Sequence, residues 1–156
     1  TAFNARAGTV GPTARRTPVQ LAAAAVGAVF LLVGILGFIP GITTNYDMLT
    51  FASHHSEAKL LGVFNVSILH NIVHLAFGVA GLAMARTFRL ARLYLIGGGA
   101  IYVLLFVYGI IIDHNSAANF IPVNTADNWL HLALAAGMLA LGLALGRTRG
   151  EAPRAA

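Results

Sequence analysis

Four long apolar runs, separated by short polar stretches, dominate the hydropathy pattern of the chain. They cover residues 19–39, 59–84, 93–112 and 127–146. A helix rises 1.5 Å per residue, so about 20 residues cross the hydrocarbon core of a bilayer, which is roughly 30 Å thick. The pattern therefore predicts an all-α integral membrane protein built as a four-transmembrane-helix bundle.

Polar residues and helix breakers between the runs predict where the helices end. Pro40 and Gly41 end the first run. Ser56 followed by Glu57 favours the start of the second helix, because a serine side chain accepts from free amides at a helix end and an acid suits its positive pole. The arginines at 86, 89 and 92 mark a short turn before the third run. The second run, about 26 residues, exceeds the bilayer core and predicts a tilted or protruding helix.

The same pattern divides the chain into one domain and two tails. Residues 1–17 are rich in Gly, Thr, Ala and Arg and predict a disordered basic tail. Residues 18–146 form the transmembrane domain, and 147–156 a second tail. A cleaved signal peptide is the alternative for the first run, but its apolar part would span only about 7–15 residues. We therefore expect the first run to remain as a span.

Composition agrees with a bilayer as the solvent. The chain is 58% apolar and 10% charged, whereas soluble proteins are about 45–50% apolar and about 25% charged. The net charge of +5 comes from basic residues in short clusters between apolar runs, so no nucleic-acid partner is expected. The absence of cysteine excludes disulfides, thiolate metal sites and thiol nucleophiles.

The distribution of charge predicts the orientation. All nine arginines lie in the two tails or in the 86–92 turn. Because cytoplasmic loops carry the excess of Lys and Arg, both termini are expected on the cytoplasmic side of a bacterial inner membrane. Four of the five acids then lie on the opposite side: Asp47, Glu57, Asp113 and Asp127.

Two related polar motifs interrupt the second and fourth runs. N-V-S-I-L-H-N-I-V-H-L covers residues 65–75, and N-T-A-D-N-W-L-H-L covers 124–132. Polar side chains within a membrane span are expensive and are candidates for function. His70 and His74 are four residues apart and share a helix face, while His131 lies at a similar predicted depth. We expect one buried polar cluster in the outer half of the bundle: Asn65, His70, Asn71, His74, Asp127, Asn128 and His131.

The motifs belong to a degenerate internal repeat. The segment from Gly27 to Gly37 aligns with that from Gly99 to Gly109, and Asn-x-x-His-Leu recurs in the same order in both halves. This arrangement predicts a tandem repeat of two helical hairpins, related by an axis along the membrane normal.

The motifs also resemble those of a known family. The signature residues are G-F-I-P-G at 37–41, N-x-x-x-L-H-N-x-x-H-L-x-x-G at 65–78 and D-N-x-x-H-L at 127–132. Over roughly residues 18–146 the chain resembles a family of small four-span bacterial membrane proteins catalogued as a domain of unknown function. The resemblance implies the fold and no activity.

The residues favour a structural or accessory membrane component without catalysis and without a cofactor. Hydrogen bonds between helices in membranes contribute about 0.6–2 kcal/mol each, so the cluster would hold the helices in register. Expected partners are the lipid bilayer and either other membrane subunits or further copies of the chain. Such association would use glycine-rich helix faces.

Alternative interpretations use the same histidines. One is a zinc or copper site formed by His70, His74 and His131, with Asp113 as a further ligand. A second is a b-type haem between histidines of facing helices. A third is an intramembrane hydrolase, for which Ser67 is the nearest candidate nucleophile. A transporter or proton relay is the fourth. Tyr102 or Tyr108 of the third run would complete or orient the cluster.

Overall fold

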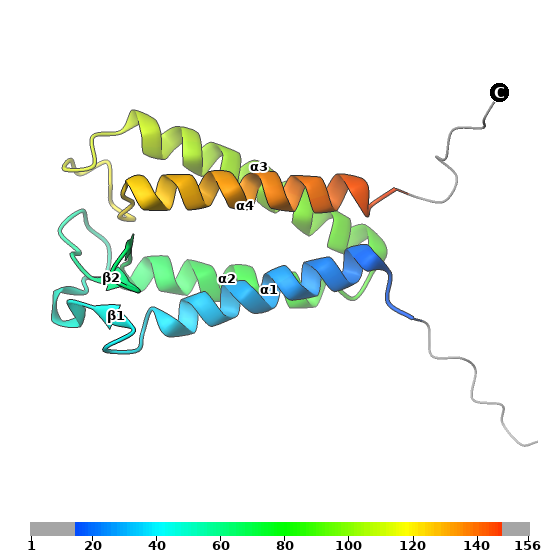
Figure 1. Cartoon of the computed structure of the whole chain (residues 1–156), viewed down its shortest axis with the longest axis horizontal. Coiled ribbons are helices and arrows are strands. Elements are labelled where there is room, and N and C mark those ends of the chain that lie inside the picture. The colour runs from blue at the N-terminus through cyan, green and yellow to red at the C-terminus, as the bar shows by residue number, and fades with distance from the viewer. Residues whose placement is uncertain (1–14, 148–156) are drawn as a thin grey trace, which may run out of the picture.

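Four α-helices lie side by side in the computed structural model, which describes residues 15–147 (Figure 1). They are α1 (Pro18–Leu36), α2 (Ile68–Met84), α3 (Phe88–Ile111) and α4 (Thr125–Ala144). Helices α1, α3 and α4 are long and apolar enough to cross a membrane, whereas α2 has 17 residues and is shorter. The structure thus confirms a mostly helical protein with membrane-length helices. The parts of the predicted tails at 1–14 and 148–156 lie outside the described residues.

The helices associate as two close pairs. Helix α1 packs along α2, α3 packs along α4, and α1 also contacts α3. Buried aromatic and aliphatic side chains lie between the pairs, among them Phe30, Tyr102 and Met138. Large apolar side chains such as Val29, Leu104 and Trp129 face outward, as a lipid environment permits.

Glycines set the spacing within each pair. A Cβ atom on Gly27 of α1 would lie 2.9 Å from the carbonyl oxygen of Gly78 and from the amide nitrogen of Leu82 in α2. A Cβ atom on Gly99 of α3 would lie 3.1 Å from the amide nitrogen of Leu139 in α4. Small residues allow helix backbones to approach closely, so these glycines meet neighbours within the chain.

A small antiparallel sheet fills the connection between α1 and α2. Its strands are β1 (Thr43–Thr44), β2 (Lys59–Leu60) and β3 (Phe64–Asn65), in the order β1-β2-β3, with a 3₁₀ turn η1 (Tyr46–Met48) after β1. Thr43 pairs with Leu60, and Lys59 pairs with Asn65. The turn between β2 and β3 has positive φ at Leu61 (53°) and Gly62 (72°), a conformation that a right-handed helix does not contain.

The expected start of the second helix at residue 59 is therefore wrong. Ser67 is the N-cap of α2, and its Oγ accepts from the His70 amide at 3.1 Å. Ser56 instead donates from Oγ to the Val66 carbonyl at 2.6 Å, beside the sheet. The apolar residues before Ser67 form strands because the positive-φ turn folds them back on one another.

The start of the third helix also differs from the prediction. Helix α3 begins at Phe88 rather than at residue 93, and Thr87 caps it by accepting from the Leu90 amide at 3.3 Å. Arg89 and Arg92 consequently lie on the first turns of α3. Charged residues at a helix end do not stop the helix when a cap precedes them.

Charge is distributed unequally between the two ends of the molecule. The sheet and the loop of residues 112–124 lie at one end, and the described chain ends lie at the other (Figure 1). The described arginines are all at or near the helix termini of that second end: Arg15, Arg16, Arg86, Arg89, Arg92 and Arg147.

The close approach of α1 and α2 gives a first prediction. Gly27→Ala should destabilise the protein by about 1–3 kcal/mol, because the added methyl group meets helix backbone that no rotamer change relieves. Gly97→Ala is the matched control, since nothing lies within 4 Å of its added Cβ. It should be neutral or stabilising by up to about 1 kcal/mol. Unfolding by SDS in mixed micelles measures both, and equal effects would contradict the packing described.

A histidine-lined cavity as the candidate functional site

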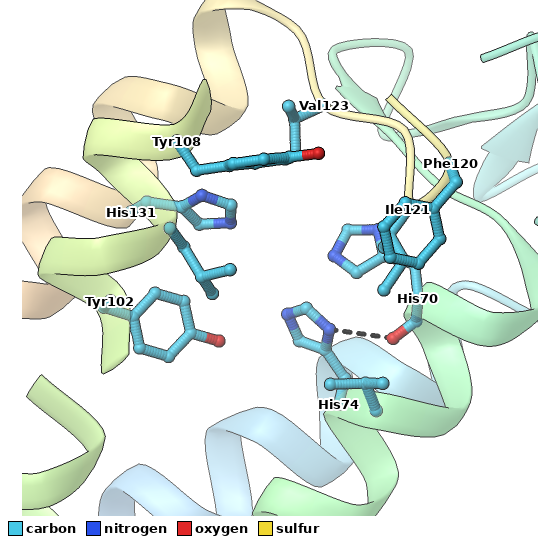
Figure 2. A pocket seen from close by; sticks show the side chains of 10 residues that line it. His70, His74, Tyr102, Tyr108, Phe120, Ile121, Val123 and His131 are labelled. Atoms are coloured by element: carbon cyan, nitrogen blue, oxygen red, sulfur yellow. Dashed lines mark hydrogen bonds between the residues drawn. The ribbon is translucent and has the colours of Figure 1, made fainter. Parts of the chain in front are cut away.

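A cavity of about 130 Å³ lies among α2, α3, α4 and the 112–124 loop. Three histidines and a tyrosine point into it from three helices (Figure 2): His70 and His74 from α2, Tyr102 from α3 and His131 from α4. The remaining lining residues are apolar or aromatic: Val73, Leu105, Tyr108, Phe120, Ile121 and Val123.

Hydrogen bonds fix the tautomers of the two histidines on α2. His70 Nδ1 lies 3.0 Å from the Asn65 carbonyl oxygen, and His74 Nδ1 lies 3.0 Å from the His70 carbonyl oxygen. A carbonyl oxygen only accepts, so Nδ1 carries the hydrogen in both rings. In the neutral imidazole Nε2 then holds a lone pair. Figure 2 shows this nitrogen of each ring pointing into the cavity.

His131 and Tyr102 form the opposite wall. Their ring centroids are 5.3 Å apart, and the Tyr102 hydroxyl points into the cavity (Figure 2). His131 Nδ1 is buried and finds no hydrogen-bond partner within the described part of the chain. Phe30 of α1 packs behind the lining, with its ring centroid 5.5 Å from that of His74 and 5.6 Å from that of Tyr102.

Asp127 joins the sheet to α4. Its Oδ2 accepts from the Asn65 amide at 3.0 Å and from the Asn124 amide at 2.8 Å. Asn124 in turn donates from Nδ2 to the Val63 carbonyl at 2.8 Å. Because the Asn65 carbonyl accepts from His70, one residue of β3 connects the Asp127 carboxylate to the cavity.

The two motif asparagines each cover a glycine of the neighbouring helix. A Cβ atom on Gly37 would collide with the Asn71 amide group, and one on Gly109 would collide with that of Asn128. Asn128 Nδ2 donates to the Gly109 carbonyl at 2.9 Å, which ties α4 to α3. Asn71 Nδ2 and Asn128 Oδ1 are buried without a hydrogen-bond partner among residues 15–147.

The structure places the candidate site residues in two groups. His70, His74 and His131 line the cavity, whereas Asn71, Asp127 and Asn128 are buried outside its lining. Asn65 was expected on the second helix and lies in β3 instead, because α2 begins only after Ser67.

Asp113 does not join the histidines. It is exposed in the loop after α3, and its Oδ1 accepts from the Asn115 amide at 2.9 Å. No group of three or more His, Asp or Glu residues in the described region is arranged to hold a metal ion.

Sequence reasoning missed Asn124 and the loop residues that roof the cavity. Asn124 carried a readable signal, because Asn followed three residues later by an acid is typical of a helix start. It is the N-cap of α4, and its Oδ1 accepts from the Asp127 amide at 3.0 Å. No comparable pattern marks Phe120, Ile121 or Val123, which reach the cavity only through tertiary folding.

Comparison with protein families assigns the chain to one of them. The model described as "Domain of unknown function (DUF4383)" matches residues 20–144. The chain belongs to this family. No curated protein and no solved structure matches it. The match confirms the expected family. Its range includes the residues that line the cavity and both polar motifs, but the family description assigns no activity to them.

The role of Asp127 gives a second prediction. Asp127→Ala should destabilise the protein by about 2–4 kcal/mol, because it leaves the amides of Asn65 and Asn124 without their acceptor. Asp47→Ala is the control. This acid is exposed in η1, and its removal should change stability by no more than about 0.5 kcal/mol. SDS unfolding compares the two variants, and a small effect at Asp127 would show that the carboxylate does not hold the sheet.

Proposed function

We propose that the protein is a non-catalytic component of the bacterial cytoplasmic membrane with a structural or accessory role. The observation that carries this proposal is the use of the buried polar groups outside the cavity. Asn124 and Asp127 bind the sheet to α4, and Asn128 binds α4 to α3. These groups serve the assembly of the helices, as interhelical polar contacts do in membranes.

The environment of Ser67 supports a non-catalytic role. Its hydroxyl caps α2 by accepting from the His70 amide, and it does not line the cavity. The polar lining consists of histidine and tyrosine side chains, with no serine or threonine among the described lining residues. Nucleophilic catalysis needs a nucleophile within hydrogen-bond reach of its base, and Ser67 lies outside the cavity into which Nε2 of His70 and of His74 point.

A four-span arrangement is part of the proposal. Helix α2 packs along α1 and is about 26 Å long at 1.5 Å per residue, slightly less than the roughly 30 Å hydrocarbon core. Local thinning of the bilayer accommodates such a difference at a fraction of a kcal/mol per ångström. The position of α2 beside three membrane-length helices supports its crossing with them.

The proposed orientation follows from the charge asymmetry. The arginine-bearing helix ends face the cytoplasm, in line with the positive-inside rule. The sheet, the 112–124 loop and the cavity then lie toward the outer face. Asp47, Glu57 and Asp113 are exposed on that side.

We also propose that the two helix pairs are a tandem repeat. Phe30 lies against His74 in the first pair, and Tyr102 lies against His131 in the second, with centroid distances of 5.5 and 5.3 Å. The glycine and asparagine contacts of Gly37 and Gly109 correspond in the same way. These equivalent contacts support two hairpins related by an axis along the membrane normal.

Cysteine labelling tests the topology. The chain contains no cysteine, so a single introduced cysteine is the only thiol in it that a maleimide can label. Leu61→Cys, at the exposed sheet turn, should react with a membrane-impermeant maleimide added to spheroplasts. Arg86→Cys should react only after permeabilisation. The reverse pattern would overturn the orientation, and external reaction of both would overturn the four spans.

A second experiment separates the structural role from metal or haem binding. The purified protein should show no Soret band and no stoichiometric zinc or copper, and it should co-purify in mild detergent with another membrane protein. Metal or haem present in the wild type and in His54→Ala/His55→Ala, but lost on replacing His70, His74 and His131 with Ala, would contradict the proposal. A protein that purifies alone as a monomer would contradict the accessory role.

A further inference from the structure

We infer that the histidine-lined cavity binds the hydroxyl-bearing head of a lipid-soluble amphiphile, an alcohol, phenol or quinol, which enters from the bilayer between α2 and α3. This inference goes beyond a structural role and rests on the proposed four-span arrangement, because that arrangement places the opening of the cavity against lipid. Its basis is a buried polar end, an apolar rim and a closed roof within one cavity.

The cavity changes from apolar to polar along its depth. Its rim consists of half-exposed apolar residues on α2 and α3, with Val73 37% exposed and Leu105 39% exposed. The three histidines beneath the rim are 6–8% exposed. An amphiphile bound with its head inward and its chain outward satisfies both regions, because apolar surface remains in contact with lipid.

The roof closes the cavity on the side of the loop. The Tyr108 hydroxyl donates to the Ala118 carbonyl at 2.6 Å. Asn119 both donates to the Val123 carbonyl and accepts from its amide, at 3.0 and 2.9 Å. These bonds fix the segment that carries Phe120, Ile121 and Val123 over the histidines (Figure 2). Entry therefore runs between the helices.

The polar end presents acceptors and a donor together. Nε2 of His70 and of His74 offer lone pairs, and the Tyr102 hydroxyl offers a hydrogen. A ligand hydroxyl donates to an imidazole and accepts from the tyrosine at the same time. An ether or ketone oxygen only accepts, so it leaves the histidine lone pairs unpaired in a buried site. A carboxylate would meet these lone pairs without a cationic partner in the lining.

The volume defines how much of the ligand is enclosed. Pockets that bury a drug-sized molecule measure about 300–1,000 Å³, whereas this cavity measures about 130 Å³. It accommodates a head group alone. The alkyl or prenyl chain of the ligand would extend past Val73 and Leu105 into the acyl chains.

Photo-crosslinking in nanodiscs tests this inference. The probe is hexadecanol with a diazirine near the hydroxyl, and its matched control is the corresponding methyl ether, which cannot donate. The alcohol should label peptides containing Val73, Leu105 or Phe120, and excess hexadecanol should suppress the labelling. The ether should label them about five- to tenfold less, as the loss of one hydrogen bond predicts.

Two pairs of variants locate the site. Tyr102→Phe should reduce labelling by the alcohol about five- to tenfold. Tyr94→Phe should leave it unchanged, because the Tyr94 hydroxyl donates to the Phe77 carbonyl away from the cavity. Val73→Trp should obstruct the rim and suppress labelling. Val79→Trp, at an exposed position of α2 outside the lining, should not.

The outcomes separate this inference from the proposed function. Equal labelling by alcohol and ether, or unchanged labelling of Tyr102→Phe, would overturn the inference even if the cysteine topology holds. Stoichiometric metal lost on replacing the three histidines would also overturn it, because the metal would occupy their lone pairs. A reversed cysteine pattern with specific alcohol labelling would instead refute the proposed orientation and leave the binding site standing.

Discussion

The Asp127 carboxylate is the contact on which the outer half of the molecule depends. It holds the backbone of Asn65 against the start of α4, although the two residues are far apart in the sequence. The Asn65 carbonyl accepts from His70 Nδ1, which leaves Nε2 directed toward the cavity. Without this acceptor, the backbone amide of Asn65 in β3 would have no hydrogen bond to α4. The orientation of His70 is thus a consequence of how the two halves of the chain meet.

A low-dielectric environment explains why the backbone amides at the helix starts are capped. Unpaired backbone groups are costly in lipid, and side chains cap three of the four helices at their first amides: Ser67, Thr87 and Asn124. Polar side-chain atoms are less completely paired: Asn71 Nδ2 and Asn128 Oδ1 are buried without a partner among residues 15–147, and the cavity gathers further polar atoms. Nε2 of His70 and of His74 and the Tyr102 hydroxyl point into a space rather than to a protein partner, which is the physical reason to regard the cavity as a binding site.

Hydropathy predicts the helices well where a run ends in a turn, and poorly where an apolar run changes conformation. The ends of α4 lie within two residues of the predicted span because strong caps and arginines bracket it. Residues 59–66 are largely apolar, yet the positive φ of Leu61 and Gly62 reverses the chain there, so that residues 59–60 and 64–65 pair as strands. Periodicity cannot separate these choices in so short a run. The sequence pattern brings His70, His74 and His131 together with either Tyr102 or Tyr108, whereas the choice between the two tyrosines depends on tertiary folding: the Tyr108 hydroxyl donates to Ala118, and that of Tyr102 points into the cavity.

The proposed repeat also explains why the two walls of the cavity differ, with a hydroxyl donor on one and imidazole acceptors on the other. Phe30 in the first hairpin and Tyr102 in the second occupy equivalent places beside His74 and His131. The substitution of tyrosine for phenylalanine supplies one hydroxyl donor on one side only. The α2 histidines, with Nδ1 committed to backbone carbonyls, supply acceptors on the other side. Two identical hairpins would line the space with like groups. The difference between the halves creates a donor opposite acceptors, the arrangement that a single hydroxyl group can bridge.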